Sequence, residues 1–277
     1  MKSRILISIS AITLLLSLAI PPRLAAQDNR DRKHAKIVTF DAPGAGIGTL
    51  ATAINPGGAI AGPYIDANNA FHGYVRAPDG TFTTFDAPGA GTGLFQGTNP
   101  FSINPAGAIA GYTVDASNVT HGFLRARDGS ITTYDVPGAG KGFFQGTFGL
   151  NINPAGAIAG YYVDEGNVHH GFLRARDGTI TTFDAPDAGT GSGQGTTTAS
   201  VDGINPAGAI AGYTLDASNV NHGFLRARDG TITTFDAPGA TTGSFEGTIP
   251  FSNNPVGVIT GYYTDPSGVI RGFLRIP

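Results

Sequence analysis

Residues 104–135 read NPAGAIAGYTVDASNVTHGFLRARDGSITTYD, and this stretch decides the fold. Its first four residues predict a turn, because proline fixes φ and glycine accepts positive φ. The later pair Asp128-Gly129 is a hairpin signal. Between these turns we place short strands at residues 108–114, 122–126 and 130–134, after a first strand that ends at Ile103. The stretch therefore predicts a unit of four antiparallel strands.

The same unit recurs along the chain. Its turn asparagine falls at Asn55, Asn104, Asn153, Asn205 and Asn254, and its strand-ending aspartate at Asp41, Asp86, Asp135, Asp184 and Asp236. Asparagine and following aspartate are 31 residues apart in all four cases, for example from 104 to 135. From each aspartate to the next asparagine the spacing is 14, 18, 18, 21 and 18 residues. We therefore expect a rigid unit whose length variation sits in one loop.

Four short strands per 40 to 50 residues are typical of propeller blades. Small residues in the second strand and large ones in the outer strands suit the wedge shape of a blade. The chain opens with residues 37–41, which match a fourth strand, and ends with a third strand that lacks a fourth. We predict an all-β, five-bladed β-propeller of four-stranded antiparallel blades, its ring closed by the N-terminal strand completing the last blade. An open β-solenoid is the alternative.

Units of the form INPAGAIAGYY followed by HGFLRARDG resemble the HAF repeats of exported bacterial proteins. The resemblance covers residues 37–277 and departs from the family pattern in having glycine after the histidine. It also has arginine where an aromatic residue often follows the Phe-Leu pair. The family has no assigned activity, so the resemblance implies an exported, β-rich protein.

The N-terminus predicts export. Residues 1–26 combine a basic start, an apolar run and a small-residue exit, as in a signal peptide. Residues 27–36 form a charged linker, and residues 37–277 a single propeller domain. We expect a monomer in the periplasm or outside the cell, with no membrane span after signal cleavage. The chain has no cysteine, so no disulfide can form.

Charge limits the partners. From residue 37 onward 10 basic residues stand against 18 acidic ones, a net charge of −8. An acidic body argues against nucleic acid or an anionic membrane as the main partner. The Gly-rich loops precede no helix, which argues against nucleotide binding. We expect no cofactor and no metal site, although the acidic body leaves Ca²⁺ as an open alternative.

Ionisable residues recur in every blade near the end that carries the long loops. An Asp/His/Asp set is typical of a catalytic or metal site, but a set present in every blade indicates a structural hydrogen-bonding network. The predicted network is Asp66, His72 and Asp86; Asp115, His121 and Asp135; Asp164, His170 and Asp184; Asp216, His222 and Asp236; and, in the last blade, Asp265, Arg271 and Asp41.

Function is expected where the repeat symmetry breaks. The long loops carry aromatic and amide side chains suited to sugar stacking and hydroxyl recognition, and the predicted ligand-binding residues are Phe95, Gln96, Phe144, Gln145, Phe245 and Glu246. The candidates for a catalytic cluster are Glu165, His169, Asp187, Asp202 and Glu246, beside the isolated Lys141. The first hypothesis is a secreted binding or scaffold propeller that recognises carbohydrate or a cell-surface polymer. The alternatives are a polysaccharide hydrolase or lyase and a purely structural envelope protein.

Overall fold

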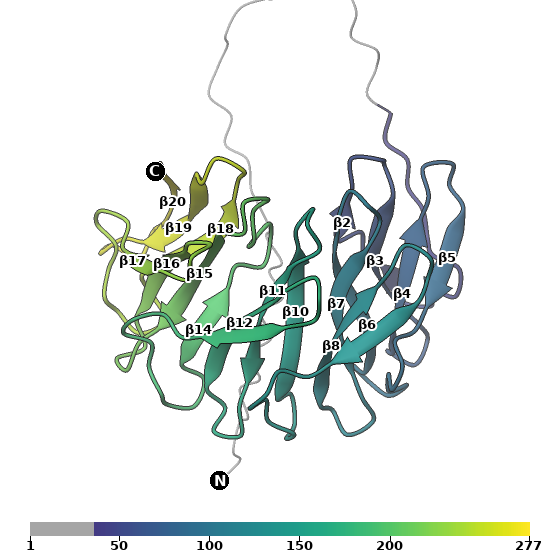
Figure 1. The fold of residues 1–277 in the computed structure, drawn as a ribbon, viewed down its shortest axis with the longest axis horizontal. Helices are drawn as coiled ribbons and strands as arrows, with labels where there is room; N and C mark the ends of the chain where they lie inside the picture. Colours follow the sequence, from purple (N-terminus) through teal and green to yellow (C-terminus); the bar gives the residue numbers. More distant parts are fainter. Residues whose placement is uncertain (1–35) are drawn as a thin grey trace, which may run out of the picture. The chain divides into compact units, whose positions relative to one another are not determined.

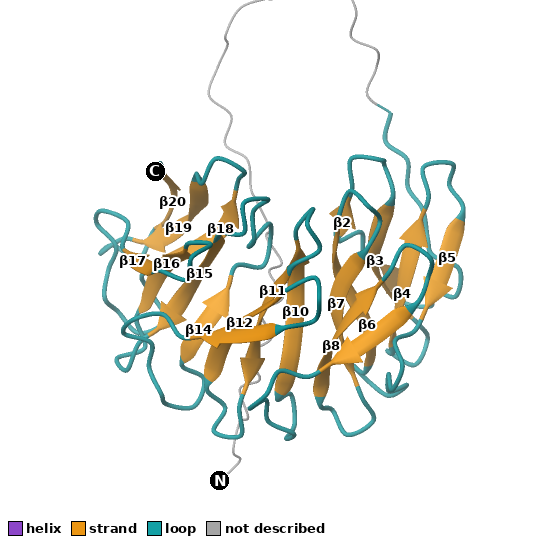
Figure 2. Ribbon diagram, viewed as in Figure 1, coloured by secondary structure: helices purple, strands orange, loops and turns teal. Residues whose placement is uncertain are grey.

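The computed structural model describes residues 36–277. Contacts divide the chain after Thr39, and the unit from Phe40 to Pro277 holds all of the strands. This unit consists of strands, turns and loops, with no helix between residues 36 and 277 (Figure 2). Consequently, no helix of this part is long and apolar enough to cross a membrane. The predicted signal peptide lies outside the described residues, as does all of the predicted linker except Lys36.

The strands fall into five repeats that follow one another in chain order (Figure 1). Repeat 1 holds β1 (Gly48–Thr49), β2 (Ala53–Ile54), β3 (Ile60–Ile65), β4 (Phe71–Arg76) and β5 (Phe82–Phe85). Repeat 2 holds β6 (Gly97–Ile103), β7 (Ile109–Val114), β8 (Thr120–Arg125) and β9 (Ile131–Tyr134). Repeat 3 holds β10 (Gly146–Ile152), β11 (Ile158–Val163), β12 (His169–Arg174) and β13 (Ile180–Phe183). Repeat 4 holds β14 (Gly195–Thr198), β15 (Ile210–Leu215), β16 (Asn221–Arg226) and β17 (Ile232–Phe235), and repeat 5 holds β18 (Thr248–Asn253), β19 (Ile259–Thr264) and β20 (Ile270–Arg275).

In repeats 2 to 5 each strand pairs antiparallel with the next, and in repeat 1 both β1 and β2 pair antiparallel with β3. In repeat 2, β6 pairs with β7, β7 with β8 and β8 with β9. One parallel bridge then links the third strand of a repeat to the first strand of the next, as between Phe71 and Gly97. Such bridges join repeats 1 to 4 into one mixed sheet of 17 strands, while β18, β19 and β20 form a separate sheet. The predicted four-stranded antiparallel unit is confirmed in repeats 2, 3 and 4.

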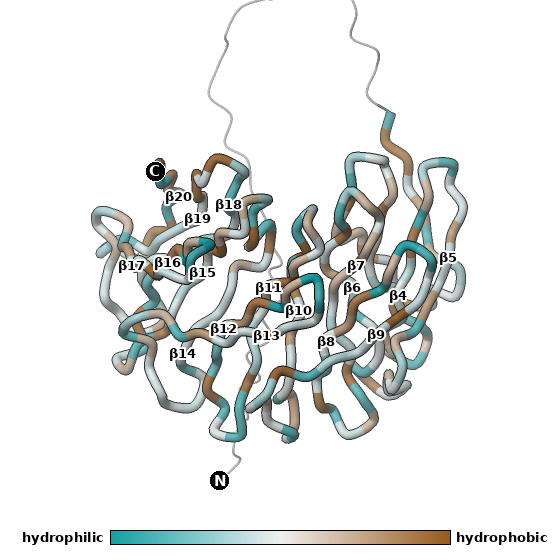
Figure 3. The backbone as a smooth tube through the Cα atoms, viewed as in Figure 1, coloured by the Kyte–Doolittle hydropathy of each residue, from teal (hydrophilic) through white to brown (hydrophobic). Residues whose placement is uncertain are grey.

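Neighbouring repeats share a hydrophobic core. Ile103 and Phe123 of repeat 2 pack with Ala61 and Ala87 of repeat 1, and the next junctions are built in the same way. Figure 3 shows hydrophobic segments recurring in the strands of each repeat. A small residue is required beside the ring of Phe123, because a Cβ on Gly111 would lie 2.2 Å from a backbone oxygen. This explains why glycine occupies that position in all five repeats.

An arginine of each repeat packs over an aromatic ring of the chain segment that precedes that repeat. The Arg125 guanidinium lies 4.9 Å from the ring centre of Phe85, the fourth-strand aromatic residue of the preceding repeat. The other arginines lie over the corresponding rings at similar distances, namely Arg174 over Tyr134, Arg226 over Phe183 and Arg275 over Phe235. Arg76 of repeat 1 lies 5.0 Å from the ring centre of Phe40. Phe40 therefore takes the place of a fourth-strand aromatic residue that precedes repeat 1.

A ladder of asparagines links the turns. The Asn104 Oδ1 accepts a hydrogen bond from the Ala108 amide at 3.0 Å, and its Nδ2 donates to the Asn153 carbonyl at 3.3 Å. The same donation from one turn to the next joins Asn55 to Asn104, Asn153 to Asn205 and Asn205 to Asn254. The first four asparagines are buried, whereas Asn254 at the end of the ladder is exposed. The turn residue thus couples each repeat to the next.

Two sequence-based expectations differ from the structure. The length variation does not lie in one loop. Thr196 follows Asp184 by the same number of residues as Thr147 follows Asp135, so the long loop before β14 is no longer than the one before β10. The extra residues of repeat 4 lie at 199–203, after β14. The predicted closure of the ring is not seen in the described residues either. Residues 36–42 form no strand, so β20 has no fourth strand beside it in the described part of the chain.

Candidate functional site

The long loop of each repeat joins two repeats at one end of the strands. The loop of residues 86–96 follows β5 and leads into β6. Its Phe95 amide donates to the Asn69 carbonyl of repeat 1 at 3.0 Å, and its Gly91 amide donates to the Val114 carbonyl of repeat 2 at 2.9 Å. The same bonds recur in the loops that lead into repeats 3 and 4. The loop is therefore held on both sides and presents its tip on a fixed backbone.

Three of these tips carry an exposed phenylalanine at positive φ. Phe95, Phe144 and Phe245 have φ values of 62°, 54° and 62° and are 47%, 39% and 69% exposed. Each is the third residue of a turn closed by the amide of the next residue, as from Gln96 to Gly93, a position that favours glycine. In the loop before repeat 4, Gly193 does occupy this position, at φ 81°. The three phenylalanines therefore stand in a strained conformation with partly exposed rings, and the Phe144 ring also contacts that of Phe143 at 4.7 Å between ring centres.

The glutamine beside each tip is used inside the loop. The Gln145 Oε1 accepts from the Gly142 amide at 2.8 Å, and its Nε2 donates to the Glu165 carbonyl at 3.2 Å and to the Asn167 Oδ1 at 2.9 Å. Gln96 makes the equivalent bonds. Both amide hydrogens are thus taken, so the side chains of these two predicted ligand-binding residues hold the loop in position.

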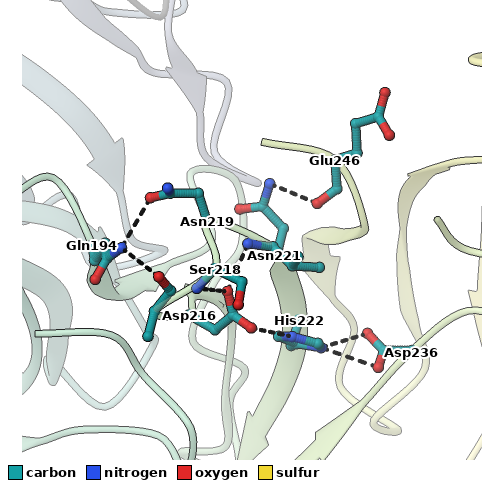
Figure 4. A network of polar contacts seen from close by, with 10 residues as sticks. Gln194, Asp216, Ser218, Asn219, Asn221, His222, Asp236 and Glu246 are labelled. Carbon is teal, nitrogen blue, oxygen red and sulfur yellow. Dashed lines mark hydrogen bonds and ion pairs between the residues drawn. The ribbon is translucent and has the colours of Figure 1, made fainter. Parts of the chain in front are cut away.

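Glu246 replaces this glutamine in the last long loop. Its backbone carbonyl accepts from Asn221, and Figure 4 shows its carboxylate pointing away from the polar network. Gln194, by contrast, keeps the glutamine bond to Asn219. The Glu246 carboxylate makes no side-chain hydrogen bond within residues 36–277, so it is free to contact a ligand beside Phe245.

Each histidine of the predicted network lies between two carboxylates. The His222 Nδ1 lies 3.0 Å from Asp236 Oδ1, and its Nε2 lies 3.5 Å from Asp216 Oδ2 (Figure 4). Asp216 also accepts from the amides of Ser218 and Val220, which closes the β15–β16 loop. Burial lowers the pKa of His222, but the hydrogen bonds and charges of both aspartates outweigh it and the pKa is raised. Protonation therefore strengthens this contact.

The other repeats keep the arrangement with one substitution. His72, His121 and His170 bind the aspartate after the fourth strand at 2.9, 2.8 and 2.9 Å. In repeat 5 the Arg271 Nε donates to Asp265 Oδ2 at 2.6 Å. Hydrogen bonds from Ser267, Val269 and Arg271 hold the pKa of Asp265 well below its usual range. The network thus ties a loop to two strands of its own repeat, and within the described residues Asp41 has no network partner.

The residues predicted to form an asymmetric catalytic cluster do not all lie at the same end of the strands. Glu165 lies in the β11–β12 loop, Asp187 in the long loop after β13, and Asp202 in the insertion at the opposite end of the strands. His169 bonds to Thr197. Among residues 36–277 no hydrogen bond or ion pair joins any two of the candidates, and no three acidic or histidine side chains are grouped to hold a metal ion.

Comparison with known proteins finds similarity to solved structures. No family model matches the chain, and no curated protein matches it. The SapL1 lectin, solved in complex with alpha methyl fucoside, is similar with a TM-score of 0.44 and 16% sequence identity. The similarity covers 83% of this chain and 77% of the lectin chain. The resemblance to HAF repeats stays a prediction.

The sequence predicted the aromatic residues at the loop tips. It did not predict their positive φ, or that the glutamine side chains form hydrogen bonds inside the loops. One signal for the strain was available. Gly193 aligns with Phe95, Phe144 and Phe245 in repeats that are otherwise nearly identical. A glycine at this position is compatible with positive φ, and it shows that the position does not need a ring for packing.

Proposed function

We propose that the protein is an exported carbohydrate-binding protein that uses the phenylalanine tips of its long loops. The observation that supports this most is the strain of Phe95, Phe144 and Phe245, whose exposed rings stand where glycine fits without cost. Strain at an exposed position is typical of functional residues. The flat ring offers apolar area to the C–H face of a sugar, and the Gly-rich backbone around it offers hydrogen-bonding groups.

The arrangement favours several weak sites on one chain. The three tips belong to the loops that lead into repeats 2, 3 and 5, while Gly193 leaves the loop into repeat 4 without a ring. A polymer with repeating sugars would engage several tips at once, and avidity would raise the affinity above that of any one site. We therefore expect a polysaccharide or a glycosylated surface as the partner, with free monosaccharides bound weakly.

A glycan-array screen of residues 27–277 tests this proposal, with and without Ca²⁺. The matched variant changes Phe95, Phe144 and Phe245 to glycine, the residue that the chain itself uses at Gly193. This variant relieves strain and should fold, so a loss of glycan binding assigns the binding to the rings. If wild-type protein binds no glycan, or the triple variant binds equally well, the proposal is wrong. A requirement for Ca²⁺ would point to the loop aspartates.

We also infer that the five repeats close into a propeller ring. Two ends of the structure expose surface that the internal junctions cover more fully: Ile54 is 67% exposed while its equivalent Ile103 is 8% exposed, and Leu274 on β20 is 61% exposed while its equivalent Leu124 is partly buried. The asparagine ladder ends in the same way, with Asn254 lacking the acceptor that Asn55 would supply. The two ends are thus complementary copies of one junction.

The repeat gives the register of the missing pairing. Leu124 on β8 pairs with Thr132 on β9, and the equivalent pair is Leu274 with Val38. In the same register Arg271 would meet Asp41, which completes the network of repeat 5. Residues 37–41 would become the fourth strand, remove the exposed edge of β20 and keep Phe40 under Arg76.

Engineered cysteines test the closure, because the chain has none of its own. The double variant Val38→Cys with Leu274→Cys should form a disulfide within one chain. The control variant Ile37→Cys with Leu274→Cys should not, since neighbouring residues of a strand point to opposite faces. Disulfide-linked dimers, or no disulfide in the first variant, would refute closure in one chain.

Export is a separate proposal from residues 1–26, and mass spectrometry of the secreted N-terminus tests it.

A further inference from the structure

Two of the positions that vary among the repeats face the same junction. The residue after the constant Gly-Thr pair of the first strand differs in every repeat: Leu50, Asn99, Phe148, Thr197 and Ile249. The residue before the network histidine or arginine also differs in every repeat: Phe71, Thr120, His169, Asn221 and Ile270. Between them the second strand carries a constant tyrosine in repeats 2 to 5. Each junction therefore has its own set of side chains on a constant frame.

The junction between repeats 3 and 4 is the most polar of these sets. The His169 ring stacks on Tyr161, with ring centres 5.1 Å apart and an angle of 14° between the planes. The His169 Nδ1 lies 3.2 Å from Thr197 Oγ1 of repeat 4. Tyr161 in turn stacks on Phe148 at 4.8 Å. The histidine is thus held in place by one ring and one hydroxyl group from two repeats.

Two polar atoms of this junction have no partner in the described part of the chain. The His169 Nε2 makes no hydrogen bond there, and the same holds for the Tyr161 hydroxyl group, although neither atom is sealed from solvent. Burial lowers the pKa of His169 and raises that of Tyr161, so both are neutral at neutral pH. The junction thus offers neutral donors and acceptors beside aromatic rings.

The loop beside this junction lacks the ring that the other long loops carry. The His169 amide donates to the Gln194 carbonyl at 2.8 Å, so the histidine lies next to the loop tip. That tip holds Ser192 and Gly193, where the preceding loop holds Phe143 and Phe144. A Cβ added at Gly193 would meet no atom within 4 Å. Open space therefore lies beside this tip.

We infer that the junction of repeats 3 and 4 is a second kind of ligand site, at which His169, Tyr161 and Thr197 bind vicinal hydroxyl groups of a neutral sugar residue. The ligand class rests on the proposed function, whereas the residues do not overlap with the phenylalanine tips. Nε2 of His169 accepts from one hydroxyl group and the Tyr161 hydroxyl group donates to its neighbour. The phenylalanine tips supply apolar contact, and this junction supplies hydroxyl selectivity.

The probe is a panel of methyl glycosides, and the readout is the imidazole nitrogen signals of the intact mature protein by NMR. We expect the His169 Nε2 signal to shift and saturate with glycosides that carry vicinal hydroxyl groups. The variant His169→Thr, which copies Thr120 of repeat 2, should weaken that binding about tenfold, the effect of one lost hydrogen bond together with the lost ring.

The tip variants separate this site from the proposed function. Changing Phe95, Phe144 and Phe245 to glycine should leave the His169 shift and its saturation unchanged. If the His169 signals do not move with any glycoside, or if His169→Thr binds glycoside as wild type does, the junction site is refuted whatever the tips bind. Persistence of the His169 response after loss of array binding by the tip variant would support two independent kinds of site.

Discussion

Asn104→Asp tests the ladder that couples the repeats. The variant keeps the Oδ1 acceptor for the Ala108 amide but removes the Nδ2 donor that bonds the Asn153 carbonyl at 3.3 Å. It also places a carboxylate beside that carbonyl at a position only 4% exposed. The change therefore removes one contact between repeats and leaves the turn itself intact.

The magnitude follows from the two losses. A hydrogen bond contributes about 1 kcal/mol, and a buried group left without its partner costs about 1–3 kcal/mol. Because 3.3 Å is long for such a bond, we take the lower end and expect the free energy of unfolding to fall by about 2 kcal/mol. Urea unfolding followed by circular dichroism at pH 7 measures the change. A fall of less than about 0.5 kcal/mol, the lower limit for one hydrogen bond, would refute the ladder as a stabilising device.

Asn254→Asp is the matched control and also reports on ring closure. The Asn254 Oδ1 accepts from the amides of Val256 and Val258, bonds that a carboxylate keeps, and its side chain is exposed. In an open chain the variant should therefore unfold like wild type. In a closed ring the Asn254 amide would donate to the Asn55 carbonyl, and the loss should equal that of Asn104→Asp. Equal losses support closure, and a neutral Asn254→Asp opposes it.

Three further changes follow from the junctions and the network. Tyr134→Phe should raise the free energy of unfolding by about 1 kcal/mol, because the buried hydroxyl group has no partner; urea unfolding measures this, and a loss of stability would contradict it. Gly160→Ala should lower the free energy of unfolding by about 3 kcal/mol, since a Cβ there would lie 2.0 Å from the Phe148 carbonyl oxygen. An unchanged free energy in urea unfolding would refute the close packing. Asp236→Asn should lower the pKa of His222, followed by NMR titration. The raised pKa of His222 stabilises the fold fully below about pH 6.5, and this contribution falls as the pH rises through the raised pKa. The free energy of unfolding lost in Asp236→Asn should therefore be largest below about pH 6.5 and smaller above it.

Turn chemistry explains why most strands could be predicted from the sequence. The Pro-Ala-Gly turn and the Asp128-Gly129 hairpin admit few backbone conformations, so residues 108–114 and 130–134 were placed as strands, close to the observed β7 (Ile109–Val114) and β9 (Ile131–Tyr134). The third strand was placed two residues late, because β8 begins at Thr120. Its start is set by the pairing of Thr120 with Val114, which no local signal shows.

The candidate site was predictable in type but not in detail. Aromatic residues in Gly-rich loops predicted a ligand-binding surface, and Phe95 and Phe144 are exposed as that prediction requires. Ligand binding itself stays a prediction. The amide of Gln145 could not be assigned, because its partner Asn167 lies 22 residues away in another loop. The insertion that holds Asp202 was misplaced because spacing alone does not say on which side of β14 the extra residues fall.

Constant and variable positions of the repeat have different physical tasks. The ladder asparagine, the glycine under the Phe123 ring and the network histidine each satisfy a bond or a contact that every repeat must make. Replacing any of them carries a cost in stability, so they are poor places for a binding surface to diversify. The first strand after its Gly-Thr pair carries no such constraint, because residues as different as Phe148 and Thr197 occupy it on the same backbone. If this chain distinguishes one sugar from another, the difference should arise at these junction positions, while the strained aromatic tips supply affinity without selectivity.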